Sequence, residues 1–172
     1  MQNRLNALEV ALNNEMRERE FYRKNAERTN NPAGKAMFQQ IAAEELEHYE
    51  RLKQLAEIWG KHQKWPETIP LKVKETIVSA ILKDMVKKAS SLPKGDEDDL
   101  KALETAINFE AKGFEFYTKL RDDCTESVEK AFFNLLANIE HEHYISLKDT
   151  QELMTDPGSW YQIKERTGLD GA

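Results

Sequence analysis

Two stretches of the sequence decide the fold: residues 38–49 read FQQIAAEELEHY, and residues 133–144 read FNLLANIEHEHY. Both contain a Glu-x-x-His motif, formed by Glu45 and His48 in the first copy and by Glu140 and His143 in the second. A spacing of three residues places the carboxylate and the imidazole side by side on one face of a helix. We therefore expect two related helices that present the same pair of polar side chains.

The repeat extends well beyond these motifs, with a constant offset of 95 residues. Aligned without a gap, residues 7–53 and 102–148 share 20 identical positions among 47. The pattern predicts two helical hairpins, each with a lone glutamate on its first helix and a Glu-x-x-His pair on its second. Two such hairpins, facing each other in a four-helix bundle, supply the ligand set of a carboxylate-bridged two-metal site. The two lone glutamates are Glu15 and Glu110.

Composition and charge favour a helical protein of one domain. The chain has 172 residues, 40% hydrophobic and 33% charged, with only 7 Gly and 5 Pro, a balance that suits long amphipathic helices. The net charge of −6 comes without a basic stripe, so we expect no nucleic-acid partner. No apolar run approaches the roughly 18 residues of a membrane span, and the N-terminus is too polar for a signal peptide. We therefore expect a cytoplasmic protein without a membrane partner.

The expected all-α bundle divides the chain, taken as one domain over residues 1–172, into four parts. Residues 1–60 form the first hairpin, and residues 96–156 form the second. Between them, residues 61–95 form a crossover long enough to travel the height of the bundle, with a short extra helix indicated by apolar residues at helical spacing. Residues 157–172 form a C-terminal tail, which we expect on the outside of the bundle.

Helix boundaries are indicated by capping residues. Asn31 and Pro32 suit the cap and the first position of the second helix. The acidic run that begins at Asp96 suits the N-terminus of the third helix, because carboxylates stabilise that end of the helix dipole. Thr125 or a nearby residue is expected to start the fourth helix. The break at Asp156-Pro157 is expected to end it.

Carboxylates on the apolar stripes of packed helices require compensation, because each one that is buried, ionised and unpaired costs several kcal/mol. Two divalent cations would balance four glutamates, and the two histidines would give each metal one imidazole. Oxygen-rich ligation of this kind suits iron or manganese better than structural zinc. We therefore predict two iron ions, with manganese or zinc as substitutes. The six predicted ligands are Glu15, Glu45, His48, Glu110, Glu140 and His143.

Two tyrosines follow the lone glutamates by two helical turns. Tyr22 and Tyr117 could donate hydrogen bonds to the ligating carboxylates and take part in the chemistry, or they could be ordinary core aromatics. The pattern leaves both interpretations open. A further set of polar residues falls on other helix faces and is expected to be solvated: Glu20, Glu47, Glu115, His141 and Glu142.

These motifs resemble the rubrerythrin-like (erythrin) branch of the ferritin-like di-iron carboxylate superfamily. The resemblance implies a ferritin-like four-helix bundle and a di-iron protein that reduces hydrogen peroxide, or reacts with dioxygen. Two alternatives stay open: a ferroxidase or iron-handling protein, and a non-catalytic helical module with a structural metal. Members of this branch are often dimeric, so a homodimer is compatible with the pattern. The matching patterns are Ala11-x3-Glu15-x6-Tyr22, Phe38-x2-Ile41-Ala42-x2-Glu45-x2-His48 and their second-half copies.

Two departures from that resemblance bear on mechanism. Rubrerythrins add a four-cysteine iron module, whereas this sequence contains only Cys124, so we expect an external electron donor such as rubredoxin or a flavoprotein. The resemblance also implies an extra glutamate one turn after the lone glutamate of the third helix, where this sequence has Gly113. The equivalent position on the first helix is Glu18. A relocated carboxylate would make Glu18 a seventh ligand and a catalytic residue; the alternative is a partly exposed glutamate.

Overall fold

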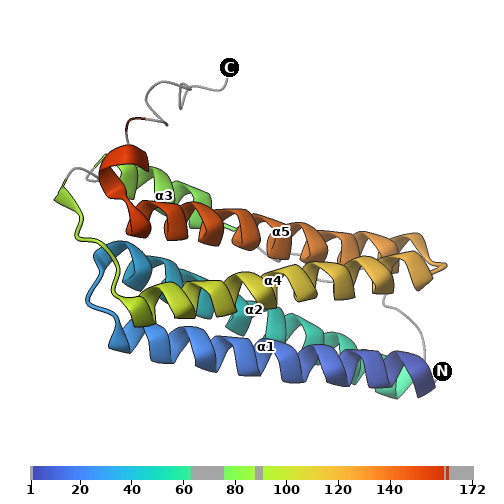
Figure 1. Ribbon diagram of the computed structural model, residues 1–172. Helices are drawn as coiled ribbons and strands as arrows, with labels where there is room; N and C mark the ends of the chain where they lie inside the picture. Colours follow the sequence, from blue (N-terminus) through green and yellow to red (C-terminus); the bar gives the residue numbers. More distant parts are fainter. Residues whose placement is uncertain (1, 63–75, 88–90, 161, 163–172) are drawn as a thin grey trace.

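The structure, a computed structural model, describes residues 2–62, 76–87, 91–160 and 162 (Figure 1). Within these residues the secondary structure is helical and contains no strand, which confirms the all-α prediction. The four long helices run side by side as a bundle, and the short α3 lies at one end of it. The helices are α1 (Gln2–Arg28), α2 (Pro32–His62), α3 (Val78–Val86), α4 (Glu97–Asp123) and α5 (Ser127–Thr155).

The first hairpin pairs α1 with α2 through a tight, capped turn. Asn31 Oδ1 accepts hydrogen bonds from the backbone N–H groups of Ala33 at 3.0 Å and Gly34 at 3.2 Å. These bonds satisfy two of the backbone donors that the start of a helix leaves unpaired. Pro32 opens α2, as predicted, because its missing N–H costs nothing at that position.

The second hairpin pairs α4 with α5. Asp96 caps α4, and its carboxylate accepts a hydrogen bond of 2.7 Å from the backbone N–H of Asp99. The helix α5 begins at Ser127, two residues after the predicted Thr125, and ends at Thr155 before the predicted break. Both hairpins therefore follow from local sequence signals.

The crossover carries α3, which packs against α2 and α5. The short helix itself was predicted, and the residues it buries are Val78 and Leu82. Residues 63–75 and 88–90 of the predicted crossover lie outside the described residues, as does the predicted tail after Trp160 except for residue 162. Trp160 itself is 4% exposed and joins the core cluster that contains Val78 and Leu82, so this part of the tail belongs to the core and is not an outside attachment.

Two apolar clusters form the core, with a layer of polar side chains between them. On α1, Ala11 belongs to one cluster and Tyr22 to the other, and Glu15 lies between them in the sequence. The other three long helices repeat this arrangement around their own glutamates and histidines. Apolar layers above and below therefore isolate the polar layer from water.

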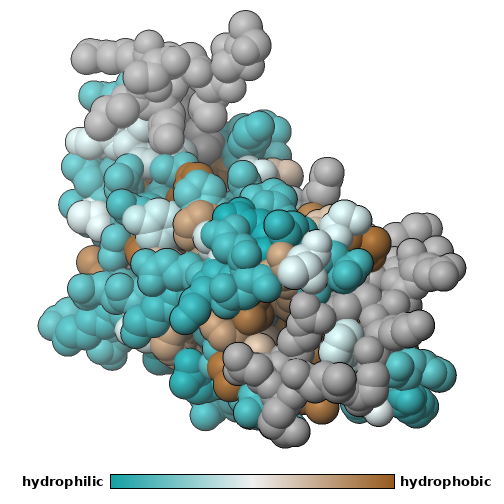
Figure 2. Space-filling view, turned by 90° about the vertical axis from the view of Figure 1, so that its right-hand side faces the viewer, coloured by the Kyte–Doolittle hydropathy of each residue, from teal (hydrophilic) through white to brown (hydrophobic). Residues whose placement is uncertain are grey.

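The surface is mostly hydrophilic at the end of the bundle seen in Figure 2, with smaller hydrophobic patches between the polar residues. In the described part of the chain, the exposed large hydrophobic residues are Val10, Met16, Ile77 and Ile145. We find no helix among the described residues with the length and apolar character needed to cross a membrane.

Candidate metal centre

The structure brings the six predicted ligands together in the polar layer, where each residue is at most 2% exposed. Their ligand atoms form two overlapping groups, within each of which all atoms lie within 4.8 Å of one another. Glu45 and Glu140 belong to both groups. The first group is Glu15, Glu45, His48 and Glu140. The second group is Glu45, Glu110, Glu140 and His143.

Each histidine directs Nδ1 toward the carboxylates. His48 Nδ1 lies 3.2 Å from Glu15 Oε2 and 3.2 Å from Glu45 Oε2. His143 Nδ1 lies 3.3 Å from Glu110 Oε2 and 3.5 Å from Glu45 Oε1. The two imidazole rings are stacked, with centroids 6.0 Å apart. The pair of Glu-x-x-His motifs thus converges on one centre from α2 and α5.

Several oxygens in this cluster have no hydrogen-bond donor among the described residues. They are Glu45 Oε1 and both carboxylate oxygens of Glu140. Buried polar atoms are nearly always hydrogen-bonded, so three such atoms on the two shared glutamates need another partner. Carboxylate oxygens together with one imidazole nitrogen per group are the ligands that iron and manganese take. The donor set therefore fits a metal site.

Without metal, protons replace the missing positive charge. Burial, reinforced by the charge of Glu45, raises the pKa of Glu15 to about 8. Burial and the neighbouring Glu45 and Glu110 raise the pKa of Glu140 well above its usual value. Burial alone would lower the pKa of His48, but Glu45 and Glu15 raise it to about 10. The metal-free cluster therefore holds protons near neutral pH, and metal binding must displace them.

Both tyrosines donate hydrogen bonds to the lone glutamates, but across the bundle. Tyr22 on α1 donates to Glu110 Oε1 on α4, and Tyr117 on α4 donates to Glu15 Oε1 on α1. Each glutamate thus keeps Oε2 for the histidine side of the cluster. Of the two open interpretations, the hydrogen-bonding one describes the geometry, although both rings are also fully buried in the core.

The comparison with family models gives a match to the rubrerythrin model over residues 6–150. The chain belongs to the rubrerythrin family. The match includes both Glu-x-x-His motifs and both lone glutamates, and it confirms the resemblance inferred from them. No curated protein and no solved structure matches the chain.

Glu18, the expected substitute for the missing rubrerythrin glutamate, is buried at 7% exposure. The alternative of a partly exposed residue is therefore wrong. Burial raises the pKa of Glu18 to about 9, and the charges of Glu45, Glu110 and Glu15 add to the increase. The Glu18 carboxyl group therefore interacts electrostatically with glutamates of both ligand groups. Its oxygens nevertheless belong to neither of the two groups of candidate ligand atoms, so the structure places Glu18 next to the site.

Gly113, where the rubrerythrin pattern implies a glutamate, leaves room for Glu140. A Cβ atom at Gly113 would lie 2.9 Å from Glu140 Oε2 and 3.2 Å from Glu140 Cδ. A side chain at that position would displace the carboxylate that both groups share. The absence of a side chain at Gly113 therefore allows the Glu140 carboxylate to occupy its position in the cluster.

We expect Gly113→Ala to weaken metal binding by about 10-fold, because the new methyl group shifts the end of the Glu140 side chain. Gly60→Ala is the matched control: Gly60 is also helical, and its added Cβ would meet nothing within 4 Å. Both variants should gain helix propensity of about 1 kcal/mol in the metal-free form. Titration with Zn²⁺ checks the affinities, and equal affinity in both variants would contradict this account of Gly113.

Glu44 gave no signal in the sequence and yet contacts the cluster. Its Oε2 lies 2.7 Å from His143 Nε2, and its side chain is 13% exposed. Burial would raise its pKa, but the bond to His143 lowers the pKa to about 2. Glu44 lies about 100° around the helix from Glu45, and the equivalent position in the second half is Ile139, so the repeat does not mark it.

The polar residues assigned to other helix faces keep away from the cluster. Glu20 pairs with Arg23 at 3.1 Å on the surface, and Glu47 lies 4.0 Å from Arg51. The side chains of the other three are exposed: Glu115, His141 and Glu142.

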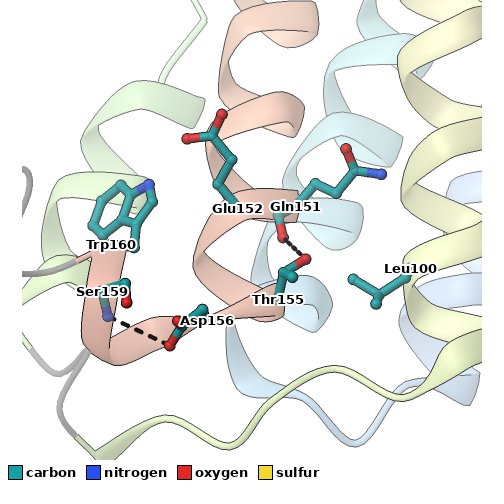
Figure 3. Close-up of a pocket in the computed structure, with 7 residues that line it drawn as sticks. All are labelled: Leu100, Gln151, Glu152, Thr155, Asp156, Ser159 and Trp160. Carbon is teal, nitrogen blue, oxygen red and sulfur yellow. Dashed lines mark hydrogen bonds between the residues drawn. The ribbon is translucent and has the colours of Figure 1, made fainter.

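A surface pocket of about 500 Å³ lies between the start of α4 and the end of α5 (Figure 3). Leu100 and Trp160 form apolar parts of its wall, and Asp156 accepts a hydrogen bond from the backbone N–H of Ser159 at its rim. None of the six predicted ligands lines it. This pocket is therefore separate from the metal centre.

Proposed function

We propose that this protein is a di-iron redox protein that reduces hydrogen peroxide to water with electrons from an external donor. One observation carries the proposal: two groups of buried ligand atoms overlap at Glu45 and Glu140, and each group contains one imidazole. Two metals held by shared carboxylates can exchange two electrons with one small oxidant. Membership of the rubrerythrin family supports the assignment to iron.

Each residue has a role in this proposal. Glu15 and His48 would hold one iron ion, Glu110 and His143 would hold the other, and the two shared glutamates would reach both. When bound, the iron pair supplies the two electrons that reduction of one peroxide molecule requires. Tyr22 and Tyr117 hold the lone glutamates in place through their O–H groups.

The surroundings of the cluster suit a small oxidant. Ala11, Ile41, Ala106 and Leu136 come from four different helices, and each is fully buried. These buried apolar side chains keep bulk water away from the cluster, and in this proposal the site admits only small molecules. A substrate such as hydrogen peroxide fits this description better than a fatty acyl group does.

Glu18 supports cycling of the metal pair between two oxidation states. Four ligating carboxylates balance two ferrous ions, and oxidation to two ferric ions adds two positive charges. A buried fifth carboxyl group next to Glu15, Glu45 and Glu110 can lose its proton and offset part of that charge. The ferric state is then stabilised without iron leaving the site, as a peroxide-reducing cycle requires.

In this proposal the electrons come from an external donor. The sequence holds one cysteine, Cys124, which is buried and cannot form a four-cysteine iron centre by itself. A rubredoxin or a flavoprotein is the kind of one-electron donor that would restore the ferrous state.

Stopped-flow mixing of the ferrous protein with peroxide or with dioxygen tests the proposal. Protein prepared without oxygen should contain two iron ions per chain, oxidise faster with hydrogen peroxide than with dioxygen, and return to the ferrous form with a chemical reductant. Faster reaction with dioxygen and release of ferric iron would favour the iron-handling alternative. A bound metal that reacts with neither oxidant would identify the site as structural.

A further inference from the structure

Glu44 contacts His143 of the metal centre, and the internal repeat has no equivalent carboxylate for His48. It reaches from α2 to α5, where its Oε2 lies 2.7 Å from His143 Nε2. The residue 95 positions later, facing the other half of the site, is Ile139, which has no polar side-chain atom. The two halves of the centre share a ligand pattern but differ at this position.

The contact fixes which nitrogen of His143 carries the proton. An ionised carboxylate can only accept a hydrogen bond, so Glu44 keeps the proton on Nε2. This leaves Nδ1 as the nitrogen available to a metal, and it lies 3.3 Å from Glu110 Oε2 and 3.5 Å from Glu45 Oε1. A carboxylate partner of this kind orients a ligating imidazole and increases its basicity.

Glu44 is itself held in place at its other oxygen. Its Oε1 accepts hydrogen bonds from Gln40 Nε2 at 2.7 Å and from the backbone N–H of Ile77 at 3.2 Å. Ile77 directly precedes α3, so the carboxylate joins α2, the crossover and α5. A group restrained from three directions can position His143 with little loss of side-chain entropy.

We propose that Glu44 is a positioning residue that makes the two metal positions unequal, so that the position with His143 binds its metal more tightly and fills first. The inference rests on the proposed pair of metals but not on the reaction with peroxide. It predicts a stepwise loading order that the near-symmetric ligand sequence does not indicate.

Titration with Co²⁺, followed by its visible absorption, tests this order in the full chain. The wild-type protein should bind two Co²⁺ ions in two separate steps. Glu44→Ala should weaken the tighter step by about 10–100-fold and leave the weaker step unchanged. Glu44→Gln keeps an acceptor oxygen but loses the charge, so its affinity in the tighter step should lie between those of the wild type and Glu44→Ala. Glu50→Gln, an exposed carboxylate on the same helix, is the matched control and should behave like wild type.

Proton NMR of the protein loaded with one Co²⁺ ion locates the effect. The Nε2–H proton of a metal-bound imidazole gives a strongly shifted signal, and the bond to Glu44 should slow its exchange with solvent. Glu44→Ala should lose this slowly exchanging signal, while a general loosening of the bundle would affect both binding steps and many other signals.

The results separate this inference from the proposed function. Two equal binding steps in the wild type, or equal weakening of both steps in Glu44→Ala, would overturn the role of Glu44. Iron-loaded protein that ignores peroxide but shows the ordered Co²⁺ steps would overturn the peroxide reaction and leave Glu44 in its role. Failure of the wild type to bind a second Co²⁺ ion would overturn both.

Discussion

Metal loading should raise the melting temperature of this protein, and the increase should grow as the pH rises from about 6.5 toward about 9. A metal present at 100 to 1,000 times its dissociation constant stabilises the folded state by about 3–4 kcal/mol. For a domain of this size, that stabilisation corresponds to an increase of roughly 5–15 °C. The expected difference between the loaded and metal-free forms is therefore large.

The pH dependence follows from the protons of the metal-free cluster. The pKa of Glu15 rises from 4.5 to about 8, and the pKa of Glu18 rises to about 9. The pKa of His48 rises from 6.5 to about 10. A group whose pKa is higher in the folded than in the unfolded protein stabilises the folded state at low pH. This stabilisation is lost as the pH rises through the pKa of the folded state. Glu44 has the opposite shift, from 4.5 to about 2, so its contribution is complete above pH 4.5 and stays constant as the pH rises further.

Bound metal replaces those protons, so the loaded protein should not lose stability over the same pH range. Thermal unfolding followed by circular dichroism, with and without Zn²⁺ at a fixed concentration, measures both forms without redox chemistry. Glu20→Gln removes a surface carboxylate whose side chain is 44% exposed, and it should keep the full pH effect. A difference in melting temperature that stays constant between pH 6.5 and 9 would contradict the proton-for-metal exchange.

The clustering of the six predicted ligands was predictable because it depends on local helix geometry. Glu45 and His48 share a helix face through a spacing of three residues, and Glu140 and His143 repeat that spacing. The 95-residue offset then brings the two copies together, since equivalent hairpins bury equivalent faces. Capping by Asn31 was also readable, because its partners lie within the next three residues.

Contacts between the hairpins could not be predicted in the same way. The sequence places Tyr22 after Glu15, but its hydrogen bond goes to Glu110 on the other hairpin. Glu44 reaches His143 only because α2 and α5 approach each other there. These partners depend on the distance and rotation between helices, which a repeat within one chain does not specify.

Glu18→Ala should slow the reaction with peroxide by about 10-fold and make the ferric state easier to reduce. Most metal binding should persist, because the oxygens of Glu18 belong to neither group of candidate ligand atoms. The reason is electrostatic: the buried Glu18 lies beside Glu15, Glu45 and Glu110, where a negative charge favours the more positive, oxidised metal pair. The peroxide rate constant and the midpoint potential are the quantities to measure.

Two further variants separate charge from packing at this position. Glu18→Gln keeps the shape of the side chain but cannot ionise, so it should match Glu18→Ala in rate and potential if the charge matters. Glu20→Ala, which removes a surface carboxylate on the same helix, should match wild type. Gly113→Glu restores the family's expected residue, but its Cβ would lie 2.9 Å from Glu140 Oε2, so it should weaken metal binding and should not rescue Glu18→Ala. Wild-type rate and potential in Glu18→Ala would leave Glu18 without a part in the redox cycle, and rescue by Gly113→Glu would show that Glu140 can move aside for the fifth carboxylate.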